Sequence, residues 1–86
     1  MQILIAPSAK RQLESLPEKA RNRIDRRILS LGENPRPHGS AALEGVSGLC
    51  RIRVGDYRVI YKIRDKDMVV LVVRIGHRRE VYWPRS

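Results

Sequence analysis

Residues 50–61 read CRIRVGDYRVIY, and this stretch decides the fold. Its first part, residues 50–54, alternates between apolar and arginine residues, which is typical of a half-buried β-strand. Gly55-Asp56 then fits a two-residue hairpin turn, because glycine readily adopts the positive φ that such turns demand. The sequence therefore predicts a β-hairpin in which Val54 pairs with Tyr57.

The register of this hairpin follows by counting from the turn. Arg53 is expected opposite Arg58, and Cys50 opposite Tyr61, so one face is apolar and the other carries Arg51, Arg53 and Arg58. Like charges directly opposite each other destabilise a sheet by roughly 0.2–1 kcal/mol, and a bound anion would remove that cost. Two interpretations follow: a phosphate-binding sheet, or a solvated basic face on which the long side chains splay apart.

Length and composition set the class of protein. The chain has 86 residues, enough for one domain with a single core, and its 18 Lys and Arg against 9 Asp and Glu give a formal net charge of +9. This excess favours a polyanionic partner, most often nucleic acid, although a merely soluble basic protein has the same composition. The lone Cys50, the lack of a signal peptide and the lack of a membrane-spanning run predict a soluble protein of the cytoplasm.

The order of apolar patterns predicts an α+β domain spanning residues 1–86. A short N-terminal strand is expected over residues 2–6, followed by a helical hairpin. We expect the first helix to begin at a Ser8 cap and to end before Pro17, and the second to end at Gly32 as a left-handed C-cap. The sheet is expected to be antiparallel with three to four strands, and the helices to pack on one of its faces.

A further strand is expected over residues 68–75, which are apolar on both faces up to Arg74. Such a strand is typical of the centre of a sheet that is covered on both sides. The helical hairpin can cover one side. An exposed apolar strip beside the basic face is therefore a candidate docking surface for another protein.

Polar and aromatic residues gather in the segment 76–82, which reads GHRREVY. Arginines can hold a phosphate, His77 can exchange a proton near neutral pH, and a tyrosine can stack on a base, although isolated His and Tyr residues are more often structural. These are the groups needed for metal-independent RNA cleavage by attack of the 2′-hydroxyl on its own phosphate. No metal or cofactor is expected, because His38 and His77 lie on different elements without an acidic cluster.

The order of elements, together with LEG at 43–45, DYRVIY at 56–61 and GHRREVY at 76–82, resembles the RelE/ParE superfamily of bacterial and archaeal toxins, and its RelE branch in particular. The resemblance covers nearly the whole chain. It implies a ribosome-dependent endoribonuclease that cuts messenger RNA in the ribosomal A site. It also implies a cognate RelB-like antitoxin that silences the toxin in a toxin–antitoxin hetero-oligomer.

The resemblance further implies roles for individual residues. Arg51 and Arg53 occupy two basic positions on the first hairpin strand, and Arg58 is the phosphate-holding arginine on the second. Arg78 and Tyr82 are the arginine and the tyrosine that follow the last strand. Some relatives have lysine at the first two positions, and arginine is a poor proton shuttle because it stays charged, so a histidine becomes a candidate general base. The expected catalytic residues are Arg51, Arg53, Arg58, His77, Arg78 and Tyr82.

Two other functions remain open on the same sequence. One is a ParE-like inhibitor of DNA gyrase, which shares the fold but does not need the arginine cluster. The other is a non-catalytic RNA-binding protein. The basic residues of the second helix fit RNA contact as well as an ordinary solvated surface; they are Lys19, Arg21, Arg23, Arg26 and Arg27.

Overall fold

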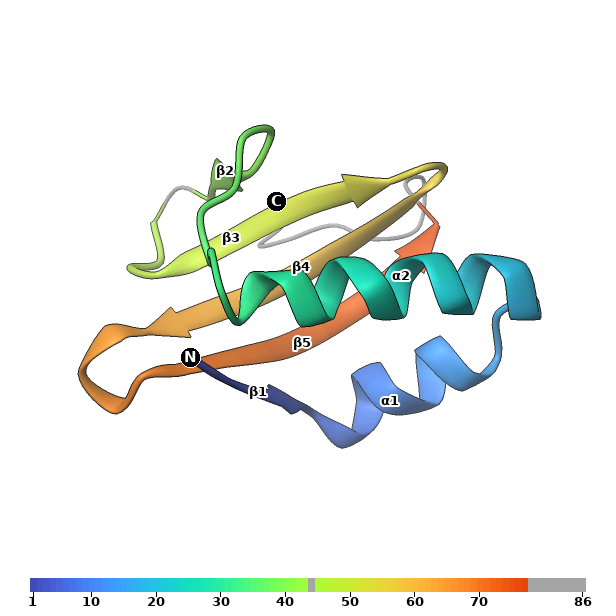
Figure 1. Ribbon diagram of the computed structural model, residues 1–86, viewed down its shortest axis with the longest axis horizontal. Helices are drawn as coiled ribbons and strands as arrows, with labels where there is room; N and C mark the ends of the chain where they lie inside the picture. Colours follow the sequence, from blue (N-terminus) through green and yellow to red (C-terminus); the bar gives the residue numbers. More distant parts are fainter. Residues whose placement is uncertain (44, 78–86) are drawn as a thin grey trace.

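The computed structural model describes residues 1–43 and 45–77, which form a mixed sheet with two α-helices on one face (Figure 1). We call this face of the sheet the helix face and the other the open face. None of the described helices is long and apolar enough to cross a membrane. The elements are β1 (Gln2–Ile5), α1 (Pro7–Glu14), α2 (Glu18–Leu31), β2 (Ala41–Ala42), β3 (Leu49–Val54), β4 (Tyr57–Arg64), a 3₁₀ turn (Asp65–Asp67) and β5 (Val69–His77).

The described strands form one five-stranded sheet in the order β1-β5-β4-β3-β2. The predicted α+β class and the helices on one face are confirmed, but the sheet is mixed rather than antiparallel. Strand β1 runs parallel to β5, because the helical hairpin carries the chain back before the antiparallel strands begin. Strand β2 pairs with β3. Because β2 has only two residues, no sequence pattern could reveal it.

The central hairpin has the register expected from its turn. Arg53 lies opposite Arg58 and Cys50 lies opposite Tyr61, and Gly55 has a φ of +61°. The alternation along β3 therefore divides its side chains between the two faces as predicted. Strand β5 lies between β1 and β4, which confirms the central position expected for this apolar segment.

The core lies between the helices and the helix face of the sheet. The buried phenol of Tyr61 donates a hydrogen bond to the Pro35 carbonyl at 2.8 Å, and burial raises its pKa to about 12. Burial also raises the pKa of the Cys50 thiol, as expected for a small core residue. The largest fully buried side chains are Tyr61, Ile24, Ile28, Leu31, Ile52, Ile75, Val59, Val70 and Val72.

The helix ends differ from the sequence prediction in two places. Helix α1 begins at Pro7 without a side-chain cap, because proline at the first position needs no hydrogen-bond acceptor for its nitrogen. Gly32 ends α2 with a φ of −65°, not in the left-handed region. A Cβ at position 32 would lie 2.9 Å from the Met1 carbonyl oxygen, and the Met1 ammonium donates to the Gly32 carbonyl at 2.6 Å. The close approach of Met1 therefore favours glycine at position 32.

The open face carries a second, smaller apolar cluster. Leu49 and Ile60 are buried on this side by the half-buried Leu43, Val46 and Val73. The segment before β3 therefore covers part of the apolar surface that the sequence left exposed. The remainder lies toward β1 and β5.

A β-bulge in β5 controls which side chains reach each face near its end. Tyr61 pairs with Val72, but Ile60 pairs with Arg74, so Val73 is an extra residue in β5. The bulge shifts the alternation by one residue. As a result Arg74 shares the open face with Ile60, whereas Ile75 and His77 face the helices.

Candidate functional site

Three of the predicted site residues are brought together on the open face. Arg53 lies directly opposite Arg58 across the β3–β4 ladder, and Arg51 is two residues along the same strand, opposite Ile60. Arg53 is exposed, whereas Arg51 and Arg58 are half-buried. The described structure thus concentrates three positive charges at one end of the open face.

Arg58 has the most unusual environment of the three. Its Nε atom is buried, yet it has no hydrogen-bond partner within the described part of the chain. An unsatisfied buried donor costs about 1–3 kcal/mol, so an anionic acceptor bound here would recover that cost. The neighbouring Arg53 is held differently, because its Nε donates to the Gly55 carbonyl at 3.0 Å.

A fourth arginine, which the site prediction did not include, joins this face. Arg74 pairs with Ile60 because of the bulge, so it follows Arg58 along the same side of the sheet. Without the bulge, position 74 would face the helices. The spacing of three between the buried residues Val72 and Ile75 marks the bulge in the structure, but the unbroken apolar run of residues 69–73 gives no sign of it in the sequence.

The structure does not bring His77 together with the arginines. His77 pairs with Tyr57 and lies on the helix face, where the two rings meet edge to face with centroids 6.0 Å apart and planes at 79°. The same bulge that adds Arg74 to the open face turns this histidine away from it. The other two predicted site residues, Arg78 and Tyr82, lie outside the described residues.

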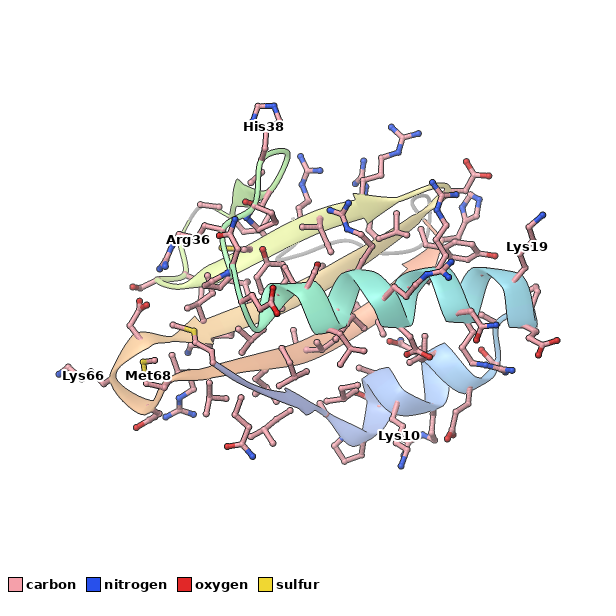
Figure 2. The ribbon with its side chains drawn as sticks, viewed as in Figure 1. Lys10, Lys19, Arg36, His38, Lys66 and Met68 are labelled. Carbon is pink, nitrogen blue, oxygen red and sulfur yellow. The ribbon has the colours of Figure 1, made fainter. Side chains whose placement is uncertain are left out.

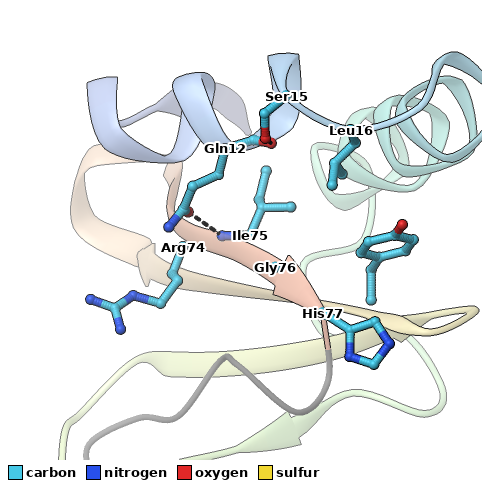
Figure 3. Close-up of a pocket in the computed structure, with 8 residues that line it drawn as sticks. Gln12, Ser15, Leu16, Arg74, Ile75, Gly76 and His77 are labelled. Atoms are coloured by element: carbon cyan, nitrogen blue, oxygen red, sulfur yellow. Dashed lines mark hydrogen bonds between the residues drawn. The ribbon is translucent and has the colours of Figure 1, made fainter.

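Helix α1 holds the end of β5 in place. Strand β1 pairs with β5 only as far as Val72, so no described strand covers the outer edge of β5 beyond that point. There the Ile75 amide donates to the Gln12 side-chain oxygen at 2.8 Å, as the dashed line in Figure 3 shows. This bond fixes the strand end that leads directly into Arg78.

An apolar strip remains on the open face away from Arg51, Arg53 and Arg58, with Arg64 beside it, opposite Val69. Leu4 is 45% exposed and lies opposite Leu71 in the β1–β5 ladder. Val69 and Leu71 are half-buried and share a shallow hollow with Leu4. The exposed apolar strip expected from the sequence thus lies between β1 and β5, outside the cluster that Leu43 and Val46 cover, and its use for docking stays a prediction.

The basic residues of α2 lie outside this site. Lys19, Arg23, Arg26 and Arg27 are exposed. Figure 2 shows Lys10 and Lys19 extending away from the two helices into solvent. These residues extend the positive surface without joining the arginines of the open face.

Comparisons with known proteins identify the family. The model of the ParE toxins of the parDE type II toxin–antitoxin system matches residues 3–82. Toxin RelE of Mycobacterium tuberculosis is 35% identical over 81 residues, which cover 93% of this chain and 84% of that protein. Toxin RelG of the same organism is 28% identical over 76 residues, or 87% of each protein. The chain therefore belongs to the RelE/ParE family of toxins of type II toxin–antitoxin systems.

Solved structures place the fold within the RelE group. The RelE–RelB complex of Pyrococcus horikoshii matches with a TM-score of 0.81 and 30% identity, covering 93% of this chain and 97% of that one. The isolated Escherichia coli RelE toxin matches with a TM-score of 0.79 and 22% identity, covering 88% and 82%. The second likeness shows the fold alone. The first, with the curated relatives, supports the resemblance to the RelE branch.

Proposed function

We propose that this protein is a ribosome-dependent endoribonuclease toxin that cuts messenger RNA in the ribosomal A site. The observation that carries the proposal is the open-face cluster of Arg51, Arg53 and Arg58, at whose centre the buried Nε of Arg58 has no partner among residues 1–43 and 45–77. A phosphodiester supplies the acceptor oxygens that this cluster lacks. The relationship to Toxin RelE of Mycobacterium tuberculosis supports a role as a toxin of this family.

The chemistry we propose needs only alignment, charge neutralisation and two proton transfers. The 2′-oxygen forms a bond to phosphorus while the bond from phosphorus to the 5′-oxygen breaks. The products are a 2′,3′-cyclic phosphate and a 5′-hydroxyl. One proton leaves the attacking 2′-hydroxyl and another reaches the departing 5′-oxygen.

The residues of the open face fit the electrostatic part of this reaction. Arg53 and Arg58 grip the scissile phosphate from neighbouring strands, and Arg78 stabilises the charge that develops on the leaving oxygen. His77 lies on the opposite face of the sheet from Arg58, so we assign to Tyr82, rather than to the histidine, the donation of the proton that reaches the 5′-oxygen, while the proton of the 2′-hydroxyl passes to solvent water. Tyr82 also offers a ring that can stack on a base.

Cleavage on programmed ribosomes tests this function. Purified ribosomes carrying a defined message in the A site should yield a new 5′ end when the toxin is added. The same message without its start codon should stay intact, because naked RNA is not positioned for attack. Equal cleavage of both messages would contradict ribosome dependence.

We also propose a partner, a RelB-like antitoxin that silences the toxin in a hetero-oligomer. The Pyrococcus horikoshii relative was solved as a complex of RelE with RelB. In this chain the exposed strip around Leu4 and Leu71, together with the formal charge of +9, suits an acidic amphipathic segment. Co-purification with the product of the adjacent gene should survive moderate salt, since apolar burial is screened little.

Inhibition of DNA gyrase is the second candidate function. The observation that favours it is the match of residues 3–82 to the model of ParE toxins. A supercoiling assay with purified gyrase separates the two candidates. Loss of supercoiling at toxin concentrations that leave translated messages intact would replace the nuclease proposal with this one.

A further inference from the structure

Two pockets adjoin at the end of the helix face nearest the β3–β4 turn. The first has a volume of about 430 Å³ and lies between the end of α1 and the end of β5, lined by Leu16, His77 and Tyr57 among others (Figure 3). The second has a volume of about 340 Å³ and lies between the start of α2 and the turn, lined by Pro17, Ala20 and Tyr57 among others. Tyr57 belongs to both, so we call the pair the Tyr57 groove.

The groove lies beside the sharp turn between the two helices, where the small side chain of Ala20 leaves space. Leu16 and Pro17 form this turn, and Ala20 is the first half-buried residue of α2. Ala20 does not reach the sheet as the larger Ile24 does one turn later. The walls of the second pocket, between Ala20 and Tyr57, are mostly apolar, and such walls favour an apolar side chain over water.

The rim of the second pocket carries two basic residues, Lys19 and Arg23, and one acidic residue, Asp56, so basic groups are in excess. Lys19 and Arg23 line the second pocket, and the Arg23 guanidinium lies against the turn, 3.0 Å from where a Cβ on Gly55 would stand. Among the described residues, the ion pairs are Arg36–Asp65 and Arg64–Asp67, so neither rim cation has a carboxylate partner. The rim therefore suits acidic side chains beside the apolar anchor.

We infer that the Tyr57 groove is a docking site for an apolar side chain of an acidic protein segment. The inference rests on the proposed function, because the antitoxin is the partner that would supply such a segment. A protein fits better than RNA, since the second pocket of the groove is mostly apolar and the arginine cluster around Arg58 lies on the opposite face. Occupation of the groove should therefore add affinity for the partner without blocking RNA at Arg58.

The test compares substitutions in the groove with a matched one outside it. Ala20→Glu places a carboxylate inside the groove, Ala20→Gln fills the same space without charge, and Arg26→Glu changes an exposed residue of the same helix outside the groove. Lys19→Glu with Arg23→Glu alters exposed rim residues only, so we expect this double variant to keep the wild-type fold, which circular dichroism checks. Affinity of each full-length toxin is measured for the antitoxin encoded by the adjacent gene, and cleavage is measured on programmed ribosomes.

We expect Ala20→Glu and the rim double variant to bind the antitoxin about 10-fold or more weakly, which is the scale of losses at an interface anchor. Ala20→Gln should weaken binding less than Ala20→Glu. Arg26→Glu should change affinity about twofold at most, because long-range charge effects are screened by salt. Cleavage by all variants should stay within a factor of about two of the wild type, because none of these residues belongs to the arginine cluster on the open face.

Other results would overturn the inference. Unchanged affinity in Ala20→Glu and in the rim variant would remove the groove from the interface. Lost cleavage with unchanged antitoxin affinity would make the groove an RNA contact instead. A wild-type protein that binds no antitoxin would overturn both the partner and the groove. A wild type that binds through the groove but cuts no message would overturn only the nuclease proposal.

Discussion

The two faces of the sheet are built from alternate residues of the same strands, yet they are organised differently. On the helix face, Ile52, Val59 and Val72 are at most 1% exposed beneath the helices. On the open face, the same strands carry the arginine cluster beside a small apolar cluster around Leu49 and Ile60. The helix face is arranged for packing. The open face keeps Arg53 and Arg58 opposite each other, and their repulsion lowers stability without any gain in packing.

This difference separates stability from function within single strands. Ile52 stands between Arg51 and Arg53, so neighbouring residues of β3 serve opposite faces. A substitution of a buried residue on the helix face should therefore lower the free energy of unfolding and leave cleavage intact. A substitution of an arginine on the open face should slow cleavage and change the free energy of unfolding little.

The largest effect on stability is expected for Ile52→Ala. Its side chain is 1% exposed in the core, so truncation should lower the free energy of unfolding by about 2–5 kcal/mol. Urea unfolding followed by circular dichroism measures the loss. Leu29→Ala is the matched control, because Leu29 is 68% exposed on α2. A change of similar size in both variants would break the contrast between the buried and exposed sites.

Arg58→Ala should have the largest effect on function. If Arg58 stabilises the transition state as an oxyanion donor does, its loss should slow single-turnover cleavage by about 100–1,000-fold, or ~2.7–4 kcal/mol. The free energy of unfolding should hold or rise slightly, since the variant removes a buried unpaired donor. A near-normal cleavage rate would remove Arg58 from the site.

Arg58→Lys sharpens this test. Lysine keeps the positive charge but lacks the planar fork that binds two phosphate oxygens at once. Partial recovery would indicate that charge contributes independently of geometry. Arg26→Ala on the outer surface of α2 should leave the rate unchanged.

The sequence predicted the hairpin well because the turn fixes its register. Gly55 determines which residues pair, and the strict alternation before it determines which face each residue occupies. Nothing local predicts the bulge at Val73, which depends on how β5 meets β4. The arginines on the central hairpin were therefore found, whereas Arg74 was missed and His77 was expected beside them.

The parallel pairing of β1 was unpredictable for a similar reason. Residues 2–5 show only that a strand forms, and not which neighbour it selects. That choice depends on how the helical hairpin connects β1 to the later strands. Pairings between residues far apart in sequence leave no short-range pattern.

A smaller effect is expected for Tyr61→Phe, on the helix face. The variant loses the hydrogen bond to the Pro35 carbonyl, so its free energy of unfolding at pH 7 should fall by about 1 kcal/mol. Burial raises the pKa of Tyr61 to about 12, above its ordinary value of about 10. Because the folded state keeps the proton longer than the unfolded state, this phenol loses its stabilising contribution as pH rises between these values.

The pH dependence separates the phenol from other alkaline titrations. The difference in free energy of unfolding between wild type and Tyr61→Phe should shrink from pH 7 to pH 11.5. Chemical unfolding of both proteins across this range measures it. A constant difference would mean that Tyr61 ionises normally in the folded protein.

The smallest effect concerns the charge repulsion on the open face. Arg53 and Arg58 are directly opposed, so Arg53→Gln should raise the free energy of unfolding by roughly 0.2–1 kcal/mol in low salt without phosphate. The variant also loses the exposed bond from Arg53 to the Gly55 carbonyl, which reduces the gain. Thermal melts of the two proteins, with Arg26→Gln as the control, measure the difference.

Added inorganic phosphate should make wild type more stable than Arg53→Gln. Wild type gains stability from any anion that binds the folded state alone, by an amount that grows with phosphate concentration, and Arg53→Gln should gain less. Sodium chloride at the same ionic strength is the necessary comparison, because screening alone also relieves repulsion between Arg53 and Arg58. A phosphate response greater than the chloride response in wild type, and reduced in Arg53→Gln, would assign the opposed arginines to anion binding. Equal responses to both salts would make the open face an ordinary solvated surface.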